Sequence, residues 1–278
     1  MATNDNYMAV GLRRVFVAKR NTTSGVMEIP AGTPAGTAYY GVRAQGALGL
    51  TPTPAAPNRV PVNGDDLLQH TFSLPPRESF TGELRVSKTD FEVIALLTGV
   101  KVFGSGDIRK VAVGTDKQGS EDDVVIWGYR EAAVGDDELT TYGNRRWELV
   151  YFPNCRVNLR GNPWQDATAA EITYDIIANL SRVDEAGVTL TEAVHGCTRA
   201  PCIMVHTTNK PWIDVFEGDG SQTDFTLSQA AYVDSDSIQV WIDGVSTAFS
   251  ETDGVVTPTG GVADGETLVI EYEWDDSV

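Results

Sequence analysis

The chain has 278 residues, of which 41% are hydrophobic and 22% are charged. This excludes wholesale disorder and suits one large or two ordinary domains. The net charge of −18 is unevenly distributed, because from Trp212 onward there are 15 acidic residues and no Lys or Arg. Such a segment repels polyanions, which argues against binding to DNA, RNA or an anionic membrane. There is no apolar run long enough for a membrane helix, and we expect no secretory signal, since the first residues lack a basic stretch followed by an apolar core.

Most of the chain alternates between apolar and polar residues with a period of two, the pattern of half-buried β-strands. The clearest case places Ile172, Tyr174 and Ile176 on one face, with Thr173 and Asp175 on the other. Aromatic and β-branched residues, which favour strands, fill the similar segments. The pattern predicts strands at residues 14–19, 37–43, 69–74, 81–88, 110–114, 124–129, 146–152 and 172–181.

A proline-rich segment occupies residues 48–66, with the sequence LGLTPTPAAPNRVPVNGDD. Its prolines pre-set an extended backbone and lack an amide donor, so we predict a long loop and exclude a central strand. Such loops tend to be functional or disordered. A surface loop is one interpretation; an arm that contacts a partner is the other, because the segment is too apolar for a solvated linker. The residues of this arm are Leu48, Leu50, Pro52, Pro54, Pro57, Val60, Pro61 and Val62.

One short segment has the pattern of a helix. Thr89 and Glu92 have the spacing of a capping box, which predicts Thr89 as the N-cap. Phe91, Ile94 and Leu97 recur on one helical face, and Gly99 follows as a stop signal. We therefore predict a helix of two to three turns lying on a sheet.

Catalytic motifs are missing from the sequence. It has no serine-hydrolase elbow, no phosphate-binding loop, no zinc-protease helix and no dinucleotide-binding fingerprint. Three histidines leave few candidates for a general base at neutral pH. Acidic pairs such as Asp122 and Asp123 have the pattern of solvated turns. We expect a protein that is not an enzyme and that has no cofactor.

One cluster of metal-ligand residue types stands out: His195, Cys197, Cys202 and His206. Two thiolates and two imidazoles are a legitimate tetrahedral zinc set, but the spacing matches no familiar finger. A Cys197–Cys202 disulfide is a second alternative, although three cysteines argue against a disulfide framework. The favoured interpretation is that the cysteines are small buried hydrophobic residues, so no metal is expected.

The acidic C-terminal segment has its own pattern, and we place a boundary between residues 1–211 and 212–278. Asp-Gly dipeptides separate short apolar runs, and Asp243-Gly244 is the strongest hairpin signal in the chain. Turns roughly every ten residues indicate a small β-sandwich. In the last strand we expect Leu268, Ile270, Tyr272 and Trp274 to face inward and Glu271, Glu273 and Asp275 to face outward.

Several segments resemble those of a known protein family. They are residues 79–86 (SFTGELRV) leading into the helix at 90–99, residues 151–157 (YFPNCRV) and the long strand at 171–182. In these and in the order of its elements, the chain resembles the major tail tube proteins of long-tailed (siphovirus-like) bacteriophages. Residues 218–227 (GDGSQTDFTL) resemble the start of small Ig-like β-sandwich modules that decorate phage virion proteins.

This resemblance implies a mainly β fold, a tail-tube-type β-sandwich or barrel with one short helix, a proline-rich arm and a C-terminal β-sandwich. It implies homohexameric rings that stack around a channel through which DNA passes without specific binding. The partners would be other copies and other tail proteins, with no membrane. The arm would reach the next ring, the module would decorate the exterior, and Asp122 and Asp123 would be lumen acids. Such a protein is made in the host cytoplasm and resides in the virion.

Two other classes of function remain open. The same β elements would serve another virion part, such as a tail terminator, a baseplate subunit or a decoration protein. The module would alternatively bind glycans through Trp212, Trp241 and Trp274. Trp274 alternates in phase with the predicted core face, which favours its burial instead.

Overall fold

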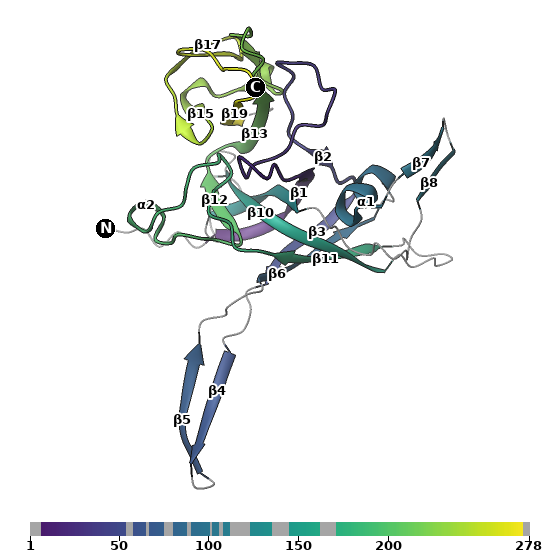
Figure 1. Ribbon diagram of the computed structural model, residues 1–278, viewed down its shortest axis with the longest axis vertical. Coiled ribbons are helices and arrows are strands. Elements are labelled where there is room, and N and C mark those ends of the chain that lie inside the picture. Colours follow the sequence, from purple (N-terminus) through teal and green to yellow (C-terminus); the bar gives the residue numbers. More distant parts are fainter. Residues whose placement is uncertain are drawn as a thin grey trace.

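The computed structural model describes residues 7–53, 58–64, 67–74, 80–87, 90–100, 102–105, 108–111, 123–134, 145–161 and 171–274. Strands dominate these residues, and only two short α-helices occur among them, so the prediction of a mainly β fold is confirmed. Figure 1 shows a body built on a large sheet, a smaller β module at one end and a long hairpin at the other.

The body contains an eight-stranded antiparallel sheet with the order β2-β1-β9-β10-β11-β6-β3, and β12 also pairs with β10. The long strand β10 organises it, since β9 and β12 flank its first half and β11 pairs with its second half. Residues in β11 are alternately buried, as their sequence predicts. The strands are β1 Tyr7–Lys19, β2 Val42–Arg43, β3 Ala47–Thr53, β6 Phe80–Val86, β9 Val124–Val134, β10 Arg145–Gly161, β11 Ile172–Ala178 and β12 Ile203–Thr207.

Helix α1 (Phe91–Thr98) packs on this sheet, as predicted. Its buried side chains include Ile94 and Leu97, and Gly99 closes it with φ of 69°. The N-cap is Asp90, whose carboxylate accepts a hydrogen bond from the Glu92 amide at 2.9 Å. The prediction of Thr89 as the cap was therefore wrong by one residue, and Thr89 itself lies outside the described residues. Asp and Thr both cap well, so spacing alone does not separate two such neighbours.

The described parts of the proline-rich segment are strands, which corrects the prediction of a long loop at residues 48–66. Its first part is β3, and its second part is β4 (Asn58–Gly64), which pairs with β5 (Leu67–Leu74) in a separate two-stranded sheet. Pro52 lies in the terminal strand of the body sheet and Pro61 in a two-stranded ribbon. Neither is in a central strand, so the lost amide donors are tolerated.

Residues 37–43 do not form the predicted strand. Only β2 is a strand there, and Tyr39 makes an isolated backbone bridge to Val215 of the module, with N–O distances of 2.8 and 2.9 Å. Tyr40 packs its ring 5.1 Å from that of Trp212. The aromatic residues that suggested a strand are therefore used to join the body to the module. Of the strand predicted at 110–114, only the start is described, in the hairpin of β7 (Val102–Ser105) and β8 (Ile108–Val111).

The C-terminal module consists of two small antiparallel sheets with orders β13-β19-β15-β16 and β14-β18-β17. Phe216 and Phe225 meet between them with ring centroids 5.3 Å apart. Its strands are β13 Lys210–Glu217, β14 Phe225–Thr226, β15 Gln239–Ile242, β16 Val245–Ser246, β17 Phe249–Thr252, β18 Val255–Pro258 and β19 Thr267–Trp274. Two short 3-10 helices lie between its strands, η2 Ala230–Tyr232 and η3 Ser235–Ser237, whereas α2 Glu192–His195 precedes β12 of the body.

The predicted hairpin at Asp243-Gly244 is confirmed. Both residues have positive φ, 47° and 75°, and they join β15 to β16 where Ile242 pairs with Val245. Positive φ at both central positions is the requirement of the tight turn that matches strand twist, and Asp-Gly meets it at little cost. Asp253 and Gly254 repeat this arrangement between β17 and β18, with φ of 53° and 74°.

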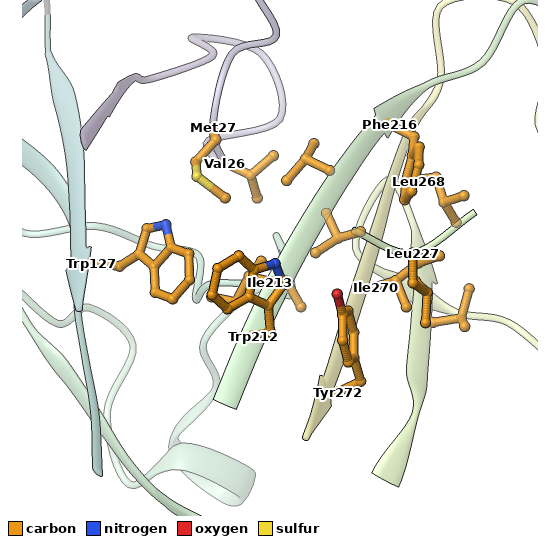
Figure 2. Close-up of a cluster of buried hydrophobic side chains, with 14 of the residues drawn as sticks. Val26, Met27, Trp127, Trp212, Ile213, Phe216, Leu227, Leu268, Ile270 and Tyr272 are labelled. Carbon is orange, nitrogen blue, oxygen red and sulfur yellow. The ribbon is translucent and has the colours of Figure 1, made fainter. Parts of the chain in front are cut away.

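The body and the module share one hydrophobic core, which Figure 2 shows running from Trp127 through Trp212 to Leu268 and Tyr272. The Trp212 ring lies 5.1 Å from Phe16 and 5.7 Å from Trp127 of the body. It also lies 5.8 Å from Trp274 of the module. Residues 211–216 of β13 are all buried, because one face of this strand packs inside the module and the other meets the body. The division into 1–211 and 212–278 stays a prediction.

Truncation of Trp212 tests this shared core. We expect Trp212→Ala to lower the free energy of unfolding by about 3–5 kcal/mol, because it removes a buried aromatic side chain with several partners. Urea unfolding followed by far-UV circular dichroism measures the change. Tyr232→Ala, at a residue that is 47% exposed, serves as the control, with an expected change within about 0.5 kcal/mol. A loss below about 1 kcal/mol at Trp212 would contradict a shared core.

Candidate functional site

The outer face of the body sheet carries a network of ion pairs on β6, β10 and β11. Arg160 lies between two carboxylates, donating to Glu83 at 2.7 Å and to Asp175. Arg85 lies 3.6 Å from Glu83 and 3.4 Å from Glu171. Cations and anions therefore alternate on this face, opposite the face that packs under α1. The result is a polar surface on which most charges are locally compensated.

Asp123, one of the two predicted lumen acids, lies beside this network just before β9. Its carboxylate is 3.3 Å from the Arg156 guanidinium of β10. Its backbone carbonyl also accepts a hydrogen bond from the Arg20 amide at 3.0 Å. The charge of Asp123 is thus compensated, while Asp122 lies outside the described residues.

The residues of the predicted arm fall into two groups. Leu48, Leu50 and Pro52 lie in β3, where Leu50 packs partly buried against the body core and Leu48 is 47% exposed. Val60, Pro61 and Val62 lie in β4, in the hairpin that Figure 1 shows extending away from the body. Pro54 and Pro57 lie outside the described residues. Only the second group is placed to contact a partner at a distance.

Two strands of the body sheet expose backbone edges. Strand β2 pairs with β1 only at Phe16 and Val17, so residues 7–11 of β1 are paired on one side, by β9, within the described chain. Strand β12 likewise has β10 as its one hydrogen-bonded neighbour there. In this part of the sheet the order is β1-β9-β10-β12, so the two open edges lie on opposite sides.

The four candidate zinc ligands are not gathered into a site. His195 ends α2, where Nδ1 accepts a hydrogen bond from the Thr191 amide at 3.1 Å and Nε2 lies 3.9 Å from Asp184. His206 lies on β12 opposite Glu148 of β10. Within the described ranges, no group of three or more His, Cys, Asp or Glu residues could hold a metal ion.

The alternative of a Cys197–Cys202 disulfide is wrong, since all three cysteines are free. Of the two cysteines in this cluster, Cys202 packs partly buried against a core that also contains the buried Cys155, as the interpretation of small hydrophobic residues predicts, whereas Cys197 is half-buried and lies in neither core cluster. Burial raises the pKa of the Cys202 thiol to about 12, and it raises that of Cys155 well above its ordinary value. These two thiols are placed for packing.

The tryptophans do not form an exposed platform for a sugar. Trp212 and Trp274 are 2% and 4% exposed, and Trp241 is partly buried against the shared core. Arg14 lies 5.5 Å and Lys210 4.5 Å from the Trp274 ring. The tryptophan side chains that were predicted to contact glycans thus pack inside the protein.

A partly buried acidic cluster at the junction between body and module was missed by sequence reasoning. Glu271 was predicted to face solvent; it does point away from the interior of the module, but the body covers that face. Its neighbours are Glu185 and Asp184 from the segment after β11, and Tyr151 of β10. Acidic residues usually lie in solvent, so sequence alone does not reveal this burial. The unbroken burial of residues 211–216 is the one related signal, since the apolar run in their sequence predicts a strand covered on both faces.

Comparisons with known proteins add no identification. No protein-family model matches the chain, and no curated protein matches it significantly. Of the helices in the described ranges, none has the length and apolar character to cross a membrane.

Thiol labelling tests the placement of the cysteines. Thiolate is the reactive form, so we expect the folded protein at pH 8 to alkylate Cys155 and Cys202 at least about tenfold more slowly than Cys197. Mass spectrometry of peptides after timed exposure to iodoacetamide measures the three rates. Urea-unfolded protein is the control, in which all three react alike. Rapid labelling of Cys155 in the folded state would contradict the described packing.

Proposed function

We propose that this protein is the structural subunit of a phage tail tube, which polymerises as stacked homohexameric rings around a channel for DNA. The proposal combines the sequence resemblance with three features of the body: a projecting hairpin, two open strand edges and a charge-compensated sheet face. In this role activity resides in the polymer, and no single chain carries a catalytic site.

The β4–β5 hairpin is the observation that carries the proposal. A two-stranded ribbon is marginally stable at best when it stands alone in water, and this one extends away from the body (Figure 1). Contact with another copy would stabilise such a ribbon. An arm of this kind, leaving the sheet between β3 and β6, fits the contact between successive rings.

The open edges support assembly within a ring. An exposed strand edge is a template for another strand, and proteins cover such edges or use them. The β1 and β12 edges lie on opposite sides of the sheet, so one copy could pair its β1 with the β12 of the next. Such a head-to-tail contact closes into a ring when the rotation between copies permits it.

The distribution of charge suits a tube that has a DNA channel inside and an acidic outer surface. On the outer sheet face, Arg85, Arg156 and Arg160 each lie beside at least one carboxylate. Arginines compensated in this way are poor phosphate ligands, and each phosphate contact would slow the passage of DNA. We therefore assign this face to the lumen. The acidic module then decorates the exterior, where its charge keeps tubes apart.

Removal of the hairpin tests the proposal. Thr53 pairs with Thr81 across β3 and β6, so a short Gly-Ser linker can replace residues 54–79 without disturbing the body sheet. We expect the concentrated natural protein to form stacked rings or tubes in negative-stain electron microscopy. The shortened variant should keep its circular dichroism spectrum and stop at monomers or single rings, since the contact between rings is lost.

A Gly-Ser insertion after Gly260, in an exposed turn of the module, is the matched control and should assemble as the natural protein does. Tubes formed equally well without the hairpin would contradict its role. Single unstacked rings from the natural protein would favour a tail terminator, and a concentrated protein that stays monomeric would contradict the tube altogether.

A further inference from the structure

The junction between body and module holds a cavity of about 90 Å³ that is partly open to solvent. Its walls come from both units, with Leu149 and Val205 on the body side and Ile213 and Gln239 on the module side. Glu185 of the body and Glu271 of the module both line it. Two carboxyl groups from separate units thus line the same cavity.

The polar atoms around this junction are poorly satisfied. Glu185 Oε2 and Glu271 Oε1 are shut off from solvent and have no hydrogen-bond partner within the described residues. The hydroxyl of Tyr151 and Nε of Arg20 are in the same condition. Buried polar groups are normally paired, so such a concentration of exceptions calls for a physical explanation. Proton uptake by Glu185 and Glu271 explains the two carboxyl groups, because a neutral carboxyl costs far less to bury than a carboxylate.

The charged groups on each side decide how the pair titrates. On the body side, Asp184 accepts hydrogen bonds from the amides of Ala186 and Val188 at 3.0 and 2.8 Å, and His195 lies beside it. Burial raises the pKa of Glu185 to about 7, and the charge of Asp184 adds to the rise. Burial raises the pKa of Glu271 well above its ordinary value, and Glu185 and Asp184 raise it further.

Glu273 also lines the cavity, where its carboxylate accepts hydrogen bonds from the amides of Thr208 and Asn209. Other charged neighbours act on Tyr151 of β10. Burial raises its pKa, as do the charges of Glu185, Glu271 and Asp184, and Arg20 acts in the opposite direction. Acidic groups therefore outnumber this one opposing cation among the groups that act on Tyr151. A second negative charge on the Glu185–Glu271 pair has little local compensation.

We propose that Glu185 and Glu271 form a proton-operated latch between the body and the acidic module. With protons bound, the two carboxyl groups stay buried together and the junction is closed. When the protons leave to solvent, two adjacent carboxylates repel each other and draw water into the cavity, and this side of the junction opens. The Trp212 cluster continues to hold the module, so opening is local.

The direction in which pH changes the stability of the closed junction follows from the linkage between proton binding and folding. A carboxyl whose pKa is higher in the folded than in the unfolded chain contributes stability at low pH, and this contribution is lost as the pH rises through the folded value. The junction should therefore loosen as the pH rises toward the pKa of Glu185 at about 7, and further as it rises toward the raised pKa of Glu271. The latch needs a single chain only, so it does not depend on assembly into a tube.

Hydrogen exchange measured by mass spectrometry tests the latch. We compare the natural protein with the Glu185→Gln, Glu271→Gln double variant at pH 6 and pH 8.5, after correction for the intrinsic exchange rate. In the natural protein, amides of residues 182–190 and β19 should exchange at least about tenfold faster at the higher pH, since each pH unit between the ordinary pKa of a carboxyl and its raised pKa in the closed junction weakens the closed state by up to tenfold. In the variant, which cannot ionise, the rates should stay constant.

Glu217→Gln removes one carboxylate, as Glu185→Gln alone does, but at an exposed position of β13, and it should behave as the natural protein does. Equal pH responses of the natural protein and the double variant would overturn the latch, as would loosening that is confined to other segments. The Glu185→Gln single variant keeps the test decisive if the double variant does not fold. Its thermal midpoint should fall less between pH 6 and pH 8.5 than that of the natural protein, and an equal fall would contradict the proposal.

Discussion

The burial of Trp212 between the body and the module is the contact on which the rest of the structure depends. Its ring meets aromatic residues of both units, and such edge-on contacts each contribute about 0.5–1.5 kcal/mol beyond the area that they bury. Because Trp212 lies near the start of β13, its docking places the whole β13–β19 sheet against the body. That placement buries Ile213 and Val215, and it also covers the face that carries Glu271. The module therefore docks on the body, and the acidic cluster of Glu271, Glu185 and Asp184 forms as a consequence of this docking.

The sequence predicted those parts of the fold in which one face of an element is buried. Strand β11, helix α1 and the hairpin at Asp243-Gly244 follow from periodicity and turn chemistry, which are local properties. Prediction failed where tertiary context decides. Tyr40 packs on Trp212 and Tyr39 makes a single backbone bridge to Val215, so neither lies in the predicted strand. The two described prolines of the arm, Pro52 and Pro61, lie in a terminal and an isolated strand that tolerate a missing donor. The burial of Glu185 and Glu271 depends on two segments that are far apart in sequence, so no local pattern reports it.

The two ends of the molecule serve different purposes in the proposed tube. Figure 1 shows the hairpin at one end and the module at the other, so contacts made by one leave the other accessible. Between them lies a sheet with two open edges and a polar face of paired charges. The acidic residues of the module are unbalanced by any cation after residue 211, which suits an exterior position. Assembly through the body and decoration by the module are thus separable properties of one chain.

The central claim is that neighbouring copies complete the hairpin and the strand edges. Hydrogen exchange of the free chain and of the assembled protein, under the same conditions, tests it most directly. The account predicts that amides of β4, β5 and the first part of β1 exchange rapidly in the free chain and at least about tenfold more slowly after assembly, because backbone hydrogen bonds and packing are gained there. Equal protection of these amides in both states would contradict the account.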